Sequence, residues 1–170
     1  MTEIQANQQI TDFEAHYHYD ATFMHELLAH SPEGYAKFSA FIPLSSHREQ
    51  LKPEEYWIAK LAAMQVEDCG DCLQLNVRMA LEAGVENAVV QATLNKGEGL
   101  PNNLRLVYRY AYQVAAHALL DADVMAQIEA AYSKGERLEF GLCIASAKVF
   151  PTIKRAMAYT KSCQLVTIEL

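Results

Sequence analysis

The chain has 170 residues, of which 51% are hydrophobic and 21% are charged, and its formal net charge is −7. This length and composition are typical of one globular domain with its own hydrophobic core. The negative charge argues against a nucleic-acid partner, because a phosphate backbone attracts stripes of Lys and Arg and the sequence has none. No apolar run is long enough to cross a bilayer, so we expect no membrane partner.

The N-terminal stretch is polar and differs from the rest of the chain. Residues 1–10 lack the basic and apolar regions of a secretory signal, so we expect a cytoplasmic protein. We divide the sequence into a loosely structured polar segment, residues 1–19, and a helical domain, residues 20–170.

Helix signals follow one another from residue 20 onward. Capping residues, prolines in first turns and apolar residues three and four apart predict the helices. They fall at residues 23–29, 35–42, 53–64, 73–83, 86–94, 104–119, 124–132, 136–149 and 152–163. Pro43 should stop the second helix, and Lys134-Gly135 should close the helix before residue 136. Only residues 164–170 alternate as a strand does, so the fold class is all-α, a single-domain bundle of roughly eight helices.

The most informative motif is a pair of thiols, Cys69 and Cys72, separated by two residues. Thiols at this spacing can close a disulfide without moving the backbone far. If Asp68 or Cys69 caps the following helix, unpaired backbone N–H groups and the helix dipole favour the first thiolate, the nucleophilic form. In a reducing compartment such a motif is catalytic or metal-binding rather than a permanent bridge. The motif therefore predicts a redox-active dithiol.

Two other interpretations of the thiols stay open. One is an inert buried pair or an adventitious disulfide. The other is a metal site, although structural zinc normally takes four ligands and the sequence has no second CxxC. Three nearby acids, Glu67, Asp68 and Asp71, oppose reactivity because like charges disfavour a thiolate. Glu67 could instead act as a base.

The surroundings of the motif carry a family resemblance. A helix led by Leu51-Lys52-Pro53 runs into the CxxC, and the next helix ends in Ala83-Gly84-Val85. Together with residues 28–33 and the long helix at 104–119, this module resembles the carboxymuconolactone decarboxylase and alkylhydroperoxidase D superfamily over roughly residues 20–160. The resemblance implies that the CxxC opens one helix of an antiparallel pair. It also implies a trimer or hexamer without a metal or organic cofactor.

The resemblance also implies roles for the thiols. Cys72 would attack a peroxide, and Cys69 would be the exposed thiol that exchanges with a thiol reductant protein. The family has a glutamate twelve residues before the first cysteine and a histidine four after the second, which resemble a proton relay. This chain has Trp57 and Asn76 there. Asn76 can form hydrogen bonds but cannot take up a proton near neutral pH. Besides Glu67, His47 in the loop before the helix pair is a candidate replacement.

We therefore expect a thiol-dependent peroxidase or disulfide oxidoreductase in antioxidant defence, acting on a hydroperoxide or a disulfide. The first alternative is a non-catalytic helical assembly protein, or a thiol redox sensor, that kept the fold. The second alternative is a lactone decarboxylase, although that branch of the family generally lacks the CxxC.

Four further positions carry structural expectations. Cys143 lies in an apolar run and should be buried. Tyr108, Tyr110 and Tyr112 cannot share one face of a helix, so at least one ring should point to a cleft or a partner subunit.

Overall fold

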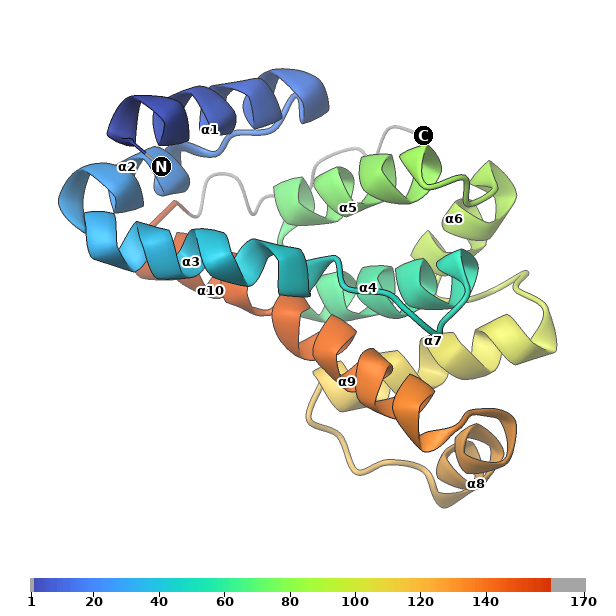
Figure 1. The fold of residues 1–170 in the computed structure, drawn as a ribbon. Coiled ribbons are helices and arrows are strands. Elements are labelled where there is room, and N and C mark those ends of the chain that lie inside the picture. Colours follow the sequence, from blue (N-terminus) through green and yellow to red (C-terminus); the bar gives the residue numbers. More distant parts are fainter. Residues whose placement is uncertain (1, 160–170) are drawn as a thin grey trace.

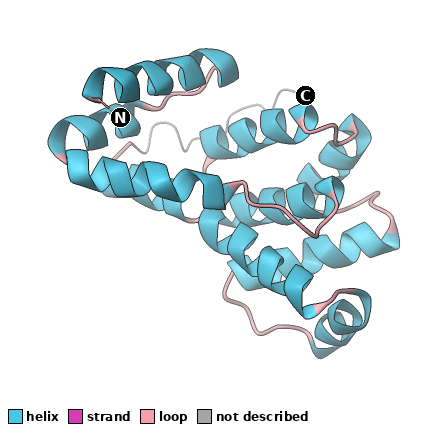
Figure 2. Ribbon diagram, in the orientation of Figure 1, coloured by secondary structure: helices cyan, strands magenta, loops and turns pink. Residues whose placement is uncertain are grey.

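The structure, a computed structural model, describes residues 2–159, and its regular elements over that range are all helical (Figure 1, Figure 2). The helices are α1 (Glu3–Tyr17), α2 (Thr22–His30), α3 (Pro32–Ser45), α4 (Pro53–Glu67), α5 (Gly70–Glu82), α6 (Asn87–Leu94), α7 (Asn102–Ala115), α8 (Ala122–Ala131), α9 (Lys134–Ala147) and α10 (Val149–Ala156). The predicted all-α class is confirmed for these residues. No helix in the described range has the length and apolar character that a membrane span requires.

Helix α4 lies at the centre of the main hydrophobic core. Its residues from Glu55 to Met64 are all buried, and α5, α6, α7 and α9 pack around it. Small residues such as Ala59, Ala62 and Ala63 let these neighbours approach closely. Burial on all sides explains why α4 is apolar around most of its circumference.

A second apolar cluster joins the N-terminal helices to α10. Phe23 of α2 and Phe38 of α3 meet edge to face, with ring centroids 6.0 Å apart. Phe38 meets Phe150 of α10 in the same way at 5.7 Å. Leu75 of α5 also packs against this cluster, so α5 lies between the two cores.

Helices α4 and α5 run in opposite directions, as expected for the helix pair (Figure 1). Asp68 ends α4 in the left-handed conformation, with φ of 49°, which Asp tolerates better than most residues. Gly84, with φ of 85°, follows the end of α5 as the predicted C-terminal glycine. The two-residue connection places Cys69 and Cys72 at the start of α5 beside the end of α4.

The expectation of loose structure before Asp20 is wrong, because α1 occupies most of that segment. Thr2 and Gln5 form a reciprocal capping box at its start. Ala6 and Ile10 are buried in the second cluster, so four-residue spacing gives α1 an apolar contact face. The two buried residues are too few to give the sequence of α1 a recognisable apolar periodicity among its polar residues.

Several predicted boundaries also moved. Helix α3 continues through Pro43 to Ser45, because a proline near a helix end removes only one backbone hydrogen bond. Lys134 and Gly135 begin α9 rather than end α8, since Ser133 and Glu136 form a capping box there. The strand-like residues 164–170 and Cys163 lie outside the described residues.

Candidate functional site

The two thiols of the CxxC motif face each other at the start of α5. Cys69 is the N-cap residue, and its carbonyl oxygen accepts the amide of Leu73 at 2.8 Å. Cys72 occupies the first turn, and its Sγ lies 2.7 Å from that of Cys69. The two cysteines are not joined to each other by a disulfide, and this separation is about 0.7 Å longer than a disulfide bond. Forming the bond therefore needs only a small side-chain movement.

Both thiols are buried, which corrects the expectation that Cys69 is exposed. Cys69 and Cys72 each retain only 2% of their accessible surface. The reason is that the segment before α2 and helix α10 both lie over the start of α5, where Tyr19 and Lys154 contact its first turn. The hydrogen bond that the Cys69 thiol donates to Cys72, and then burial, raise the pKa of Cys69. Cys69 is thus the proton donor of the pair and Cys72 the acceptor.

A tyrosine from a distant part of the sequence also contacts the thiol pair. The Tyr19 hydroxyl lies 3.8 Å from Cys72 Sγ, within hydrogen-bonding distance for sulfur, and its ring is 7% exposed. Burial, and then the negative charge of Cys72, raise the pKa of Tyr19 far above its usual value. The hydroxyl therefore stays protonated and can donate to a Cys72 thiolate.

An apolar cavity of about 200 Å³ lies between the two hydrophobic clusters, with Cys72 in its wall. Its lining is rich in aromatic and methionine side chains, namely Phe13, Tyr19, Phe23, Tyr35, Trp57, Phe150, Met24, Met64 and Met79. Exposed residues Gln9 of α1 and Ser46 after α3 also line it, so the cavity reaches the surface between these helices. Cys72 and the exposed residues Gln9 and Ser46 thus line the same cavity.

Among the described residues that line the cavity, Lys60 carries an ammonium group, and its three N–H donors are all used. Lys60 is 3% exposed and its Nζ donates to Ser45 O at 2.8 Å, Cys143 O at 3.0 Å and Ser146 Oγ at 2.8 Å. Burial lowers the pKa of Lys60. Its three donors tie α4 to α3 and α9, so it acts as a structural link rather than as a ligand for an anion.

The two positions that depart from the family pattern both line this cavity. Asn76 donates from Nδ2 to the backbone oxygen of Cys72 at 2.7 Å, which fixes its amide beside the motif. Trp57 is buried at 8% exposure and contributes an indole wall. These residues shape the cavity next to the thiols and supply no titratable group near neutral pH.

The other two candidate residues, Glu67 and His47, make their contacts with groups other than the two sulfur atoms. Glu67 bonds Arg155 at 2.6 Å and lies 3.6 Å from Lys148, so its carboxylate binds the α9–α10 junction and α10. His47 is exposed in the loop after α3 and is not among the residues that line the cavity. A role as base for either residue stays a prediction.

Sequence reasoning missed Tyr19 and Lys154. Tyr19 stands in a segment expected to be loose, and Lys154 reads as an ordinary cation on an amphipathic helix. No local pattern reports that these side chains meet a motif more than fifty residues away. Only the tertiary packing of α10 and the α1–α2 connection brings them to the first turn of α5.

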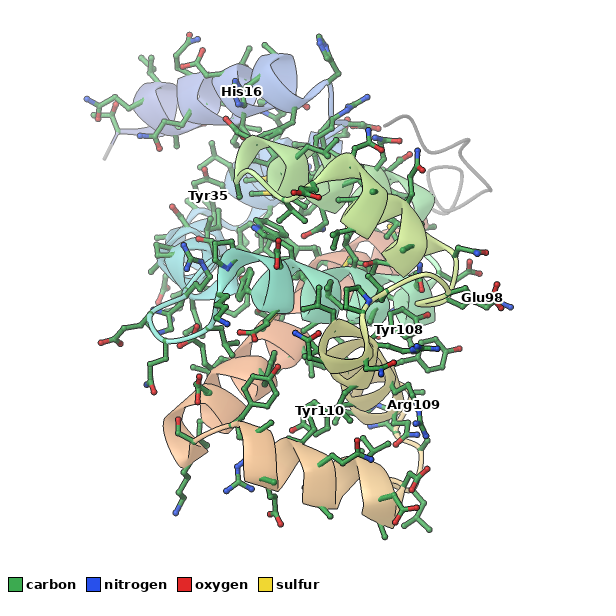
Figure 3. All side chains as sticks on the ribbon, turned by 90° about the vertical axis from the view of Figure 1, so that its right-hand side faces the viewer. His16, Tyr35, Glu98, Tyr108, Arg109 and Tyr110 are labelled. Atoms are coloured by element: carbon green, nitrogen blue, oxygen red, sulfur yellow. The ribbon has the colours of Figure 1, made fainter. Side chains whose placement is uncertain are left out.

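The structure also places the remaining cysteine and tyrosine residues for which the sequence carried an expectation. Cys143 is 1% exposed, as predicted. Tyr108 and Tyr110 are buried and leave α7 in different directions (Figure 3). Tyr112 is 43% exposed, and a partner subunit for it stays a prediction. Within residues 2–159 no three His, Cys, Asp or Glu side chains gather as ligands for a metal ion.

Comparison of the chain with protein-family models, with curated proteins and with solved structures finds no match. The family resemblance, the trimer or hexamer and the cytoplasmic location therefore remain predictions.

Proposed function

We propose that this protein is a thiol-dependent oxidoreductase whose Cys69–Cys72 dithiol reduces an apolar organic hydroperoxide. The observation that carries the proposal is the 2.7 Å separation of the two sulfur atoms, with Cys72 in the wall of an apolar cavity. A dithiol at this distance can pass between reduced and disulfide forms without backbone rearrangement. The family resemblance of the motif points to the same chemistry.

The reaction assigns a different role to each sulfur. The Cys72 thiolate attacks the terminal peroxide oxygen, an S–O bond forms, the O–O bond breaks and an alkoxide leaves. The alkoxide takes the proton of the Cys69 thiol and becomes the alcohol. The Cys69 thiolate then attacks Cys72, an S–S bond replaces the S–O bond, and the hydroxide that leaves takes a proton from solvent. A dithiol reductant restores the two thiols by exchange.

Substrate class follows from the cavity. A volume of about 200 Å³ lined by aromatic rings and methionines suits an organic hydroperoxide with an apolar body better than hydrogen peroxide. Burial of the apolar part would favour binding, by about 25 cal/mol for each Å² removed from water. The same aromatic surface would exclude a large protein disulfide, so that type of partner would have to exchange with the thiols in another conformation.

A thiol redox sensor is the second candidate, and two observations favour it. Both sulfur atoms are buried, and Trp57 and Asn76 occupy the positions where the family has an ionisable relay. A sensor would form the same disulfide but would be reduced slowly. The difference between the two functions is therefore the rate of the reductive half-reaction.

The test is steady-state loss of cumene hydroperoxide in the presence of dithiothreitol. The proposal predicts turnover by the wild type, loss of turnover in Cys72→Ser and Cys69→Ser, and unchanged turnover in Cys143→Ser, which is the matched control for a buried thiol. It also predicts a higher kcat/KM for cumene hydroperoxide than for hydrogen peroxide. A wild-type rate no faster than that of Cys72→Ser would remove the peroxidase. A single oxidation without turnover would identify a sensor.

A further inference from the structure

Helix α10 places a buried ammonium beside the thiol motif. Lys154 is 2% exposed, and within the described residues its Nζ has no hydrogen-bond partner. The Nζ lies 3.6 Å from a carboxylate oxygen of Asp71, which stands between the two cysteines, and 4.9 Å from the centre of the Tyr19 ring. A buried lysine without hydrogen bonds is costly, so its position needs an explanation.

Within the described residues, the groups around Lys154 come from two segments, the start of α5 and the connection before α2. Asp71 and Cys69 belong to the start of α5, and Tyr19 and Asp20 belong to the connection before α2. The positive charge of Lys154 opposes the rise in the pKa of Cys69 and contributes to a lowered pKa of Asp20, whose main cause is its hydrogen bond with Thr22. The charge of Lys154 therefore acts on both Cys69 and Asp20.

Glu67, an acid at the end of α4, is paired with Arg155 rather than with Lys154. The Glu67 and Arg155 side chains lie 2.6 Å apart at the outer edge of α10. Arg155 is exposed, whereas Lys154 is on the buried face of the same helix. The buried cation thus lies against Asp71 and Tyr19, the residues beside the thiols.

We propose that Lys154 and Tyr19 together replace the missing relay by stabilising the Cys72 thiolate. Tyr19 is the catalytic member, because its hydroxyl lies 3.8 Å from the reacting sulfur and can donate a hydrogen bond to the thiolate. Lys154 is a positioning residue: its ammonium lies over the Tyr19 ring and offsets the charge of Asp71. This proposal rests on the proposed dithiol function and identifies the groups that stabilise its nucleophile, the Cys72 thiolate.

The alternative is that the Lys154–Asp71 pair only holds α10 against α5. Removing either partner of a structural ion pair would then change the thiol in the same direction. An electrostatic role predicts opposite directions, because Lys154→Met leaves a negative charge near Cys72 and Asp71→Asn removes one. Lys154→Met leaves the Asp71 carboxylate, which is 25% exposed, whereas Asp71→Asn leaves the 2% exposed Lys154 without its ion-pair partner, so the folding of both variants is checked by circular dichroism.

The experiment measures alkylation of Cys72 by iodoacetamide as a function of pH, resolved by peptide mass spectrometry, in a Cys69→Ser background. Lys154→Met should slow the neutral-pH reaction about tenfold and move its pH profile upward, since an opposite charge nearby lowers a thiol pKa by a unit or more. Lys154→Arg should retain the wild-type profile. Asp71→Asn should speed the reaction, and Tyr19→Phe should slow it severalfold. Lys37→Met, which removes a distant exposed charge, is the control for net charge.

Overlapping profiles of Lys154→Met, Tyr19→Phe and the parent would overturn the inference, and so would slower alkylation in Asp71→Asn. If Lys154→Met does not fold by circular dichroism, Asp71→Asn and Tyr19→Phe decide the question alone. The proposed function is judged separately from wild-type peroxide turnover. Turnover together with unchanged profiles would therefore reject the relay while leaving the dithiol chemistry in place.

Discussion

The loop before α4 is held by one buried carboxylate, Glu139 of α9. Its Oε1 accepts the amides of Glu49 at 3.0 Å and Leu51 at 3.3 Å, and its Oε2 accepts the amide of Gln50 at 2.9 Å. Glu139 is 4% exposed, so these amides replace most of its water. The three bonds fix the loop that leads from the cavity wall into the central helix.

We predict that Glu139→Ala destabilises the fold by about 2–4 kcal/mol, because hydrogen bonds to a charged acceptor contribute about 1.5–3 kcal/mol each. The sum of three is reduced because Glu49 and Gln50 lie in an exposed loop where water can replace the carboxylate. Glu139→Gln keeps a carbonyl at Oε1 for two amides but places an NH₂ group against the third. It should lose about 1–2 kcal/mol.

The assay is urea unfolding followed by circular dichroism, with the slope m compared between variants. Glu129→Ala is the control, because Glu129 makes a half-exposed pair with Arg137 and should change stability by less than about 0.5 kcal/mol. Equal losses for the Ala and Gln variants of Glu139 would refute the reasoning, since they would show that the number of amides accepted does not matter. A loss no larger than that of Glu129→Ala would refute it as well.

Three further predictions concern the rest of the fold. Burial raises the pKa of Cys143 to about 11, so iodoacetamide at neutral pH should modify its peptide in urea but not in the native protein; rapid native labelling would contradict this. Burial raises the pKa of Tyr56 and Tyr132, so their stabilisation is complete below about pH 10 and is lost above it. The loss of stability from these two tyrosines should exceed the gain from Lys60, whose lowered pKa makes stability rise with pH. The urea concentration at the unfolding midpoint should therefore be lower at about pH 11 than at about pH 8; a higher midpoint at about pH 11 would contradict this account. Gly97→Ala should cost about 1–2 kcal/mol in urea unfolding, because φ there is +79° and the new Cβ would lie 3.0 Å from an aromatic ring; an unchanged midpoint would contradict it.

Local signals predicted the helices that have strong caps and wide apolar faces. Pro53 opens α4, Asp121 caps α8 and Gly84 follows α5, as the sequence indicates. Helix α1 was missed because only a narrow stripe of it contacts the core. Its stability depends on packing against α2, and tertiary packing of this kind leaves a weak mark on sequence periodicity.

The candidate site also has one part that the sequence predicts and one part that only the tertiary structure shows. Cys69 and Cys72 are close in sequence, so their spacing alone predicted that the sulfurs could meet. Tyr19, Lys154 and the cavity are made by contacts between distant segments, and one sequence carries no record of which distant residues meet. The burial of Cys69 was missed for that reason, because the groups that cover it come from the α1–α2 connection and α10.

The central claim is that the two sulfurs act as one redox unit. Its most direct test is a single-turnover reaction of the fully reduced protein with one equivalent of cumene hydroperoxide, followed by alkylation and peptide mass spectrometry. The account predicts loss of two thiols for each peroxide, one intramolecular disulfide between Cys69 and Cys72, and an unmodified Cys143. Retention of both thiols, or over-oxidation of Cys72 with Cys69 still reduced, would contradict it.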